Sequence, residues 1–181
     1  MFKTIFALFV VGVLSLTAPS AQAQPVGVGI KLGVPATDAF KVIQTSSISS
    51  SDHFVWGPYL ELHLPGGNSV EIDALRRGYD FNVFKGNSYE FPVVLKHRIG
   101  SGLIRPYFEG GAAFSRLSDI RLSTLNHRSN YGIVAGGGVQ INLLLLKLSP
   151  EVRYTGWALR NFDGTLRTNR NQIQVLMGFG F

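Results

Sequence analysis

The chain has 181 residues, a formal net charge of +6 at pH 7 and no cysteine. Its length suits one domain, and the lack of cysteine excludes a disulfide, a thiol nucleophile, a cysteine metal site and a lipidated N-terminal cysteine. A basic chain can bind nucleic acid, but an exported protein does not meet it. Because the N-terminus has an export signal, we expect contact with anionic lipid headgroups and no nucleic-acid partner.

The first 23 residues have the pattern of a helical secretory signal peptide. Lys3 precedes an apolar run over residues 5–16, and Ala21 and Ala23 form an A-x-A cleavage site. The run is shorter than the ~20 residues that a transmembrane helix needs, so an uncleaved membrane anchor is the less favoured alternative. We expect cleavage after Ala23, which leaves one domain over residues 24–181.

Alternation of apolar and polar residues, the pattern of a strand with two different faces, recurs along the rest of the chain. The alternating segments cover residues 26–34, 54–64, 69–77, 88–98, 105–116, 131–142, 146–157 and 171–181. Each has about the 9–11 residues with which a tilted strand crosses a bilayer. The pattern therefore predicts an all-β protein with eight strands.

The connectors between these segments alternate in length. Long connectors cover residues 35–52, 78–87, 117–130 and 158–170, and short ones cover 65–68, 99–104 and 143–145. Outer-membrane barrels have short periplasmic turns and long outer loops. A soluble sandwich is not expected to show this alternation of loop lengths. We expect an antiparallel up-and-down transmembrane β-barrel.

Charged residues collect on the strand face opposite the aliphatic residues. The parity of the alternation assigns to this face Lys31, Glu61, Glu71, Asp73, Arg77, Glu90, Lys96, Arg98, Glu109, Lys147, Glu151 and Arg153. An eight-stranded barrel is just wide enough inside to be filled by side chains. Balanced acids and bases there predict a closed, charge-paired lumen, which disfavours an open pore. In a soluble barrel the apolar face would point inward instead, and alternation alone does not distinguish the two.

The aliphatic face also carries most of the aromatic residues, near strand ends. They are Trp56, Tyr89, Phe91, Phe108, Phe114, Tyr131, Tyr154, Phe179 and Phe181. This placement is typical of the aromatic girdles of a membrane barrel, although core aromatics of a soluble sheet are an alternative. Arg76 and His97 fall on the same face by parity, close to strand ends where a charge costs only ~0–1 kcal/mol.

The last segment sets Met177, Phe179 and Phe181 on the apolar face at steps of two. A final strand that closes on a terminal aromatic residue resembles the recognition signal that the barrel-assembly machinery reads. The resemblance implies that this machinery is a partner during biogenesis and that these three residues form an assembly signal.

Four stretches carry a wider family likeness: residues 29–33 (GIKLG), 105–111 (RPYFEGG), 132–138 (GIVAGGG) and 175–181 (VLMGFGF). With them, residues 25–181 resemble the small eight-stranded outer-membrane barrels of the OmpA/OmpX type. The resemblance implies the fold and a bacterial outer-membrane location, in contact with outer-membrane lipid. The group contains adhesins, anchors, surface-resistance proteins and lipid-modifying enzymes, so membership implies no single activity.

No catalytic, cofactor or metal site is expected. Gly27, Gly29 and Gly33 form G-x-G-x-x-x-G, one residue too long for the dinucleotide fingerprint and inside a strand. None of the histidines (53, 63, 97 and 127) adjoins a motif that identifies a nucleophile. Asp52 and His53 are two adjacent ligand types in a loop, too few for a metal site.

The third and fourth outer connectors are basic, with Arg116, Arg121, His127, Arg128, Arg160, Arg167 and Arg170. These residues form either a solvated rim or a surface for an anionic partner, because arginine suits phosphate and carboxylate. We expect a non-enzymatic outer-membrane protein with a structural or surface-interaction role. A lipid-modifying enzyme at the outer rim and a soluble periplasmic ligand-binding barrel are the alternatives.

Overall fold

The computed structural model of the chain describes residues 25–37, 40–42, 51–81, 84–118, 129–158, 166–168 and 170–181. The expected signal peptide, including Ala21 and Ala23, lies outside these residues. The strands are β1 (Val26–Pro35), β2 (Phe40–Val42), β3 (Ser51–His63), β4 (Asn68–Asp73), β5 (Leu75–Phe81), β6 (Phe84–Arg98), β7 (Ile104–Ser118), β8 (Ser129–Leu143), β9 (Leu146–Trp157), β10 (Leu166–Thr168) and β11 (Asn171–Gly180).

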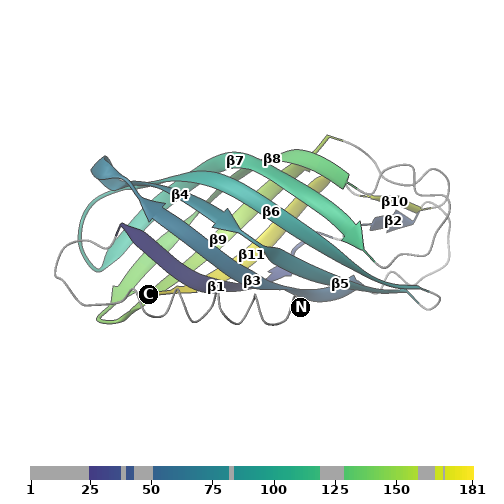
Figure 1. Cartoon of the computed structure of the whole chain (residues 1–181), viewed down its shortest axis with the longest axis horizontal. Helices are drawn as coiled ribbons and strands as arrows, with labels where there is room; N and C mark the ends of the chain where they lie inside the picture. The colour runs from purple at the N-terminus through teal and green to yellow at the C-terminus, as the bar shows by residue number, and fades with distance from the viewer. Residues whose placement is uncertain are drawn as a thin grey trace, which may run out of the picture.

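The long strands form a closed antiparallel ring (Figure 1). Its order is β1, β11, β9, β8, β7, β6, β4 with β5, and β3, and the pairing of β3 with β1 closes it. Because β4 and β5 share one place in the ring, the barrel has eight strand positions. The predicted eight-stranded up-and-down barrel is confirmed.

The break between β4 and β5 falls on Ala74 alone. The register of the pairing with β6 is the same on both sides of it, since Ile72 pairs with Val93 and Leu75 with Glu90. Pro58 of β3 and Pro92 of β6 lie opposite this point, and proline has no N–H to donate to the ladder. Ala74 still donates its N–H to the carbonyl of Pro58 at 2.9 Å. The break is thus a local gap in one continuous strand, opposite prolines that remove donors from the two neighbouring strands.

The strands are staggered around the ring. Successive cross-strand partners lead once around the barrel and end ten residues further along the first strand; the path is Val26, Leu62, Val70, Leu95, Gly110, Ala135, Tyr154, Ile173 and Ala36. Such a stagger requires strands tilted to the barrel axis, and in an eight-stranded barrel it leaves an interior that side chains can fill.

The two ends of the barrel differ. At the short-turn end, the turns at residues 64–67, 99–103 and 144–145 join β3 to β4, β6 to β7 and β8 to β9, and the N–H of Phe181 bonds to the carbonyl of Val28. Gly66 and Gly67 have φ of 74° and 77°, a region that glycine adopts without steric penalty. At the other end, the connector end, the chain leaves β1, β5, β7 and β9.

The prediction of a long second connector over residues 78–87 is wrong. β5 continues to Phe81 and β6 begins at Phe84, and these two residues pair. Gly78, Gly86 and Asn87 are residue types that occur often in loops, but pairing between neighbouring strands outweighs local composition in a sheet. In addition, β2 and β10, which lie in stretches expected to be loops, form a small antiparallel sheet beyond the connector end of the barrel (Figure 1).

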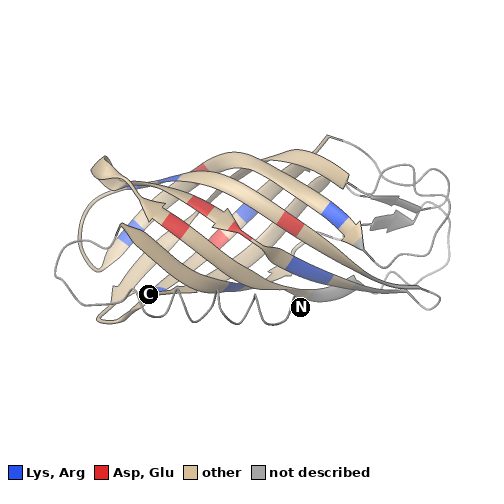
Figure 2. Ribbon diagram, in the orientation of Figure 1, with Lys and Arg blue, Asp and Glu red and all other residues tan. Residues whose placement is uncertain are grey.

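The two faces of the strands separate by polarity as the alternation predicted. Apolar side chains such as Ile133 (71% exposed), Phe108 (56%) and Leu95 (54%) cover the outside, whereas the charged side chains of the lumen-facing positions are buried. Figure 2 shows where the charged residues lie along the strands. This inverts the arrangement of a soluble ligand-binding barrel, which needs an apolar interior and a polar exterior. Among the residues that the structure describes, no helix has the length and apolar character needed to cross a membrane.

Candidate functional site: a charged cluster in the lumen

Seven of the charged residues predicted to face the lumen meet near the middle of the barrel, and we call them the central cluster. They come from β1, β4, β6, β7 and β9, and each is at most 4% exposed: Lys31, Glu71, Asp73, Lys96, Glu109, Glu151 and Arg153. Each lies between residues of the outer face, so strand alternation alone turns it inward.

Lys31 of β1 contacts three carboxylates. Its Nζ lies 2.5 Å from Glu71 Oε1, 2.9 Å from Glu151 Oε1 and 3.3 Å from Asp73 Oδ2. The same ammonium lies 5.5 Å from the centre of the Tyr59 ring. Neighbouring glycines on the inner face of β1 give these groups room, since a Cβ at Gly29 would lie 2.5 Å from the Tyr59 ring.

Lys96 of β6 reaches the same carboxylates from another side. Its Nζ lies 2.7 Å from Glu71, 3.3 Å from Glu151 and 3.5 Å from Glu109. Tyr107 places its ring 4.7 Å from this ammonium and donates its hydroxyl to Glu151 Oε2 at 2.7 Å. The ammonium of Lys96 therefore contacts three carboxylates and lies near one aromatic ring.

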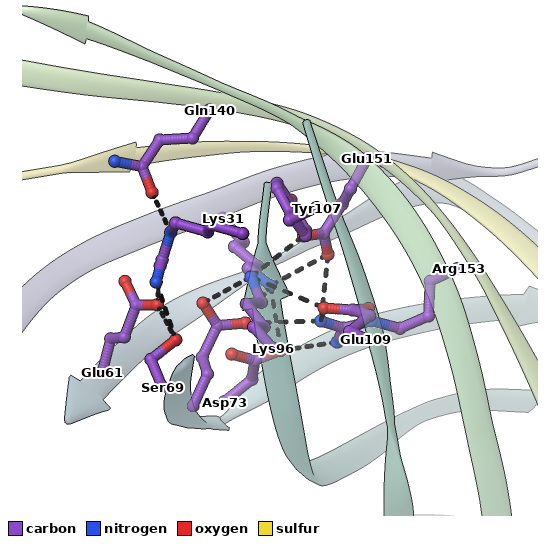
Figure 3. A network of polar contacts seen from close by, with 12 residues as sticks. Lys31, Glu61, Ser69, Asp73, Lys96, Tyr107, Glu109, Gln140, Glu151 and Arg153 are labelled. Carbon is purple, nitrogen blue, oxygen red and sulfur yellow. Dashed lines mark hydrogen bonds and ion pairs between the residues drawn. The ribbon is translucent and has the colours of Figure 1, made fainter. Parts of the chain in front are cut away.

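Arg153 of β9 contacts all four acids of the cluster. Figure 3 labels it together with three of them, Asp73, Glu109 and Glu151. Its Nη1 lies 2.5 Å from Asp73 and its Nε 2.7 Å from Glu109. Its Nη2 lies 3.0 Å from Glu151 and 3.4 Å from Glu71. The planar guanidinium suits such a role, because it offers five donors in fixed directions.

Every acid of the central cluster contacts at least two of its bases. Burial of an unpaired charge is costly, and removing one partner of a buried pair leaves such a charge behind. The carboxylates of Glu71, Glu109 and Glu151 lie close enough to hold a metal ion, with ligand atoms within 4.8 Å of one another. Lys96 Nζ contacts all three of them, so an ammonium already occupies the position that a cation would take.

A second polar group lies between the central cluster and the short-turn end. Arg98 pairs with Glu61 and donates to Ser69 Oγ at 3.0 Å and to Gln140 Oε1 at 2.5 Å. Ser69 in turn donates to Glu61 at 2.6 Å. Lys147, also predicted to face the lumen, is half-buried nearer this end and approaches the carbonyl of Phe181 at 3.5 Å.

The two remaining predicted charges, Arg77 and Glu90, are buried and bond to glutamines of β11. Gln174 donates to Glu90 Oε2 at 3.0 Å, and Arg77 Nη1 donates to Gln172 at 3.4 Å. The charge pattern in the sequence did not mark the neutral members of these networks, such as Ser69 and Gln140. Their parity is the signal that assigns them to the lumen.

The described histidines do not form a catalytic triad. His63 Nε2 lies 3.6 Å from Glu61 Oε2, and Ser69 bonds to that same carboxylate. In a triad the histidine lies between the nucleophile and the acid, whereas here the acid lies between the other two. His97 faces outward, bonds to Asn68 Oδ1 at 2.8 Å and packs near the Phe108 ring. The side chains of residues 53 and 127 lie outside the described parts.

The predicted assembly-signal residues lie on the outer face of the last strand. Phe181 is 63% exposed, and Met177 and Phe179 are half-buried. Of the basic residues predicted for the outer connectors, Arg116 and Arg170 are described and exposed. Arg121, His127, Arg128 and Arg160 fall outside the described residues, and the side chain of Arg167 in β10 does too.

The sequence matches no family model and no curated protein. The structure is similar to Neisserial surface protein A (TM-score 0.62, 13% identity, 87% of this chain and 96% of that one). It is also similar to the N-terminal β-barrel domain of Pseudomonas aeruginosa OprF (0.53, 13%, 88% and 100%) and to the outer membrane enzyme PagL (0.50, 12%, 86% and 98%). The chain therefore has the fold of the small eight-stranded outer-membrane barrels. Because one of these neighbours is an enzyme, the fold leaves the activity open.

Proposed function

We propose that the chain is a non-enzymatic outer-membrane protein with a closed lumen, which serves as a rigid anchor for its outer connectors. The central cluster is the observation that carries this proposal. It links five strand positions through buried ion pairs and fills the middle of the barrel with side chains.

The outer surface supports the proposed location. Exposed aliphatic and aromatic side chains cover strands all around the ring, and they include Ile30, Phe54, Leu62, Ile72, Leu95, Phe108, Ile133, Val152 and Val175. Soluble monomers rarely expose a contiguous apolar surface of that extent, whereas a lipid-facing band requires it. The neighbours with this fold are themselves described as outer-membrane or surface proteins.

The interior argues against a passive pore. A channel needs a continuous aqueous path, but Lys31, Lys96 and Arg153 cross the lumen to carboxylates on other strands. Opening a path would separate buried charges from their partners at a cost of several kcal/mol. We expect the barrel to insert into bilayers without stepwise conductance.

The enzymatic alternative rests on the likeness to PagL. No serine–histidine hydrogen bond occurs within the described residues. The described serine, acid and histidine that come closest to a triad are Ser69, Glu61 and His63. They lie at the short-turn end, away from the outer rim where the enzymatic alternative requires them. A comparison of the outer-membrane lipids of a deletion strain with those of its parent, by mass spectrometry, tests this point. Unchanged lipid A and phospholipid acylation supports the anchor role, and the loss of a specific modification would contradict it.

A further inference from the structure

A row of exposed side chains crosses the outer surface near the connector end. Cross-strand pairing joins Trp56 to Arg76, Arg76 to Tyr89, Tyr89 to Arg116, and Arg116 to Ser129. All five side chains are exposed, and we call them the arginine row. It lies on β3, β5, β6, β7 and β8, so two arginines stand on the apolar face with one tyrosine between them.

The rows of outward-facing residues next to the arginine row change from aromatic to aliphatic towards the middle of the barrel, in the order of the interface and the hydrocarbon layer of a bilayer leaflet. Towards the middle of the barrel the next outward row is aromatic, where Phe91 pairs with Phe114 and Phe114 with Tyr131. The row after that is aliphatic and includes Val93 and Ile133. Aromatic girdles mark the membrane–water interfaces of such barrels, so the arginine row lies at the depth of the lipid headgroups.

The two arginines have no carboxylate to neutralise them in the described part of the outer face. The buried acids of the strands all point into the lumen; they are Glu61, Glu71, Asp73, Glu90, Glu109 and Glu151. Arg116 has no hydrogen-bond or ion-pair partner among the described residues. An anion from outside the chain would therefore meet two positive charges without competition from a carboxylate in the described part of that face.

Arg76 is held in a fixed direction. Its Nε and Nη2 both donate to the side-chain oxygen of Asn87, at 3.1 and 2.8 Å. This contact leaves Nη1 available to a ligand. Arg76 and Arg116 stand two strands apart, roughly 10 Å between backbones, a span over which two long side chains can converge on one phosphate group. Guanidinium groups bind phosphate through paired, charge-assisted hydrogen bonds.

We propose that Arg76 and Arg116, with the Tyr89 hydroxyl between them, bind a phosphate of the anionic glycolipid, lipopolysaccharide, that forms the outer leaflet. This inference rests on the proposed outer-membrane location, because the connector end then faces the outside. The aromatic and aliphatic rows below the arginines would contact the acyl chains of the same lipid. Arg116 is one of the basic residues predicted for the outer connectors, but it lies within β7; the other basic residues of that prediction are not part of this site.

The test uses the full mature chain, folded in detergent micelles, and fluorescently labelled lipopolysaccharide followed by anisotropy. Folding is checked first by the different gel mobilities of unheated and heated samples, so a failure of folding or location is recognised separately from a failure of binding. The variants are Arg76→Gln and Arg116→Gln. Arg170→Gln is the matched control, because it also removes one exposed arginine from the connector end, outside the arginine row, and the Nε of Arg170 already donates to the carbonyl of Trp157 at 3.0 Å.

We expect each of the two row variants to weaken binding about fivefold, the effect of one basic residue near an anionic membrane surface, and the control to bind like the unaltered protein. Dephosphorylated lipopolysaccharide should bind much more weakly, and inorganic phosphate alone should not compete at millimolar concentration. Equal losses in all three variants would show a general basic field and overturn the site. Equally tight binding of dephosphorylated lipopolysaccharide or of phosphatidylglycerol would overturn the assignment to a glycolipid phosphate.

Discussion

Replacement of Arg153 by methionine removes a guanidinium that contacts all four carboxylates of the central cluster. Methionine fills similar space, so the main change is electrostatic. The variant leaves four buried acids facing only Lys31 and Lys96. Breaking a buried pair by removing one partner costs about 3–5 kcal/mol. We expect the free energy of unfolding to fall by about this amount.

Urea unfolding of the barrel in lipid vesicles measures this loss, with the folded fraction read from the unheated gel band. Arg116→Gln removes an exposed arginine that has no hydrogen-bond or ion-pair partner among the described residues, and it should change the free energy of unfolding by less than about 0.5 kcal/mol. Pairing Arg153→Met with Glu109→Gln removes one of the stranded charges, so the double variant should lose less than the sum of the single losses. A loss below about 1 kcal/mol for Arg153→Met would refute the view that the cluster holds the barrel together.

Three further predictions follow from the faces and contacts of the barrel. Val175→Arg, on the outer face, should lower the free energy of unfolding by ~2–4 kcal/mol in vesicles, whereas Ser149→Ala on the inner face should have a much smaller effect; similar losses would mean that the faces are misassigned. Gly29→Val should prevent formation of the heat-modifiable folded band, because its Cβ would lie 2.3 Å from the carbonyl of Phe179, and a normal folded band would contradict the close packing of β1 and β11. Lys96→Ala should vacate a three-carboxylate site that can bind calcium, and bound calcium should stabilise the folded barrel. Adding calcium should therefore raise the thermal midpoint of unfolding of the variant but not of the unaltered protein. An equal rise in both proteins would show that the ammonium does not occupy the site.

The strand pattern could be predicted from the sequence because side-chain direction in a strand has a period of two. Ile30 and Lys31 already specify which face of β1 meets lipid, and the structure exposes the first and buries the second. The same parity placed Arg76 on the outer face near a strand end. Local alternation was therefore enough for the fold and for the list of residues that face the lumen.

The contacts inside the lumen could not be predicted in the same way. Arg153 meets Asp73 across 80 residues of sequence, and their meeting depends on the stagger accumulated around the whole ring. Connector lengths were also poorly predicted where pairing overrode composition, as in the extension of β5 to Phe81. The sequence pattern predicts which face of a strand each side chain occupies. Which partner that side chain contacts depends on how the strands are staggered in the closed barrel.

Fractionation of cells, followed by unheated and heated lanes on one SDS gel, tests the central claim most directly. An outer-membrane barrel with a polar lumen and an apolar exterior should sediment with the outer membrane and require detergent for extraction. Its unheated band should then migrate differently from its heated band. Recovery of the protein in the soluble periplasmic fraction without detergent, with one band at both temperatures, would contradict the account.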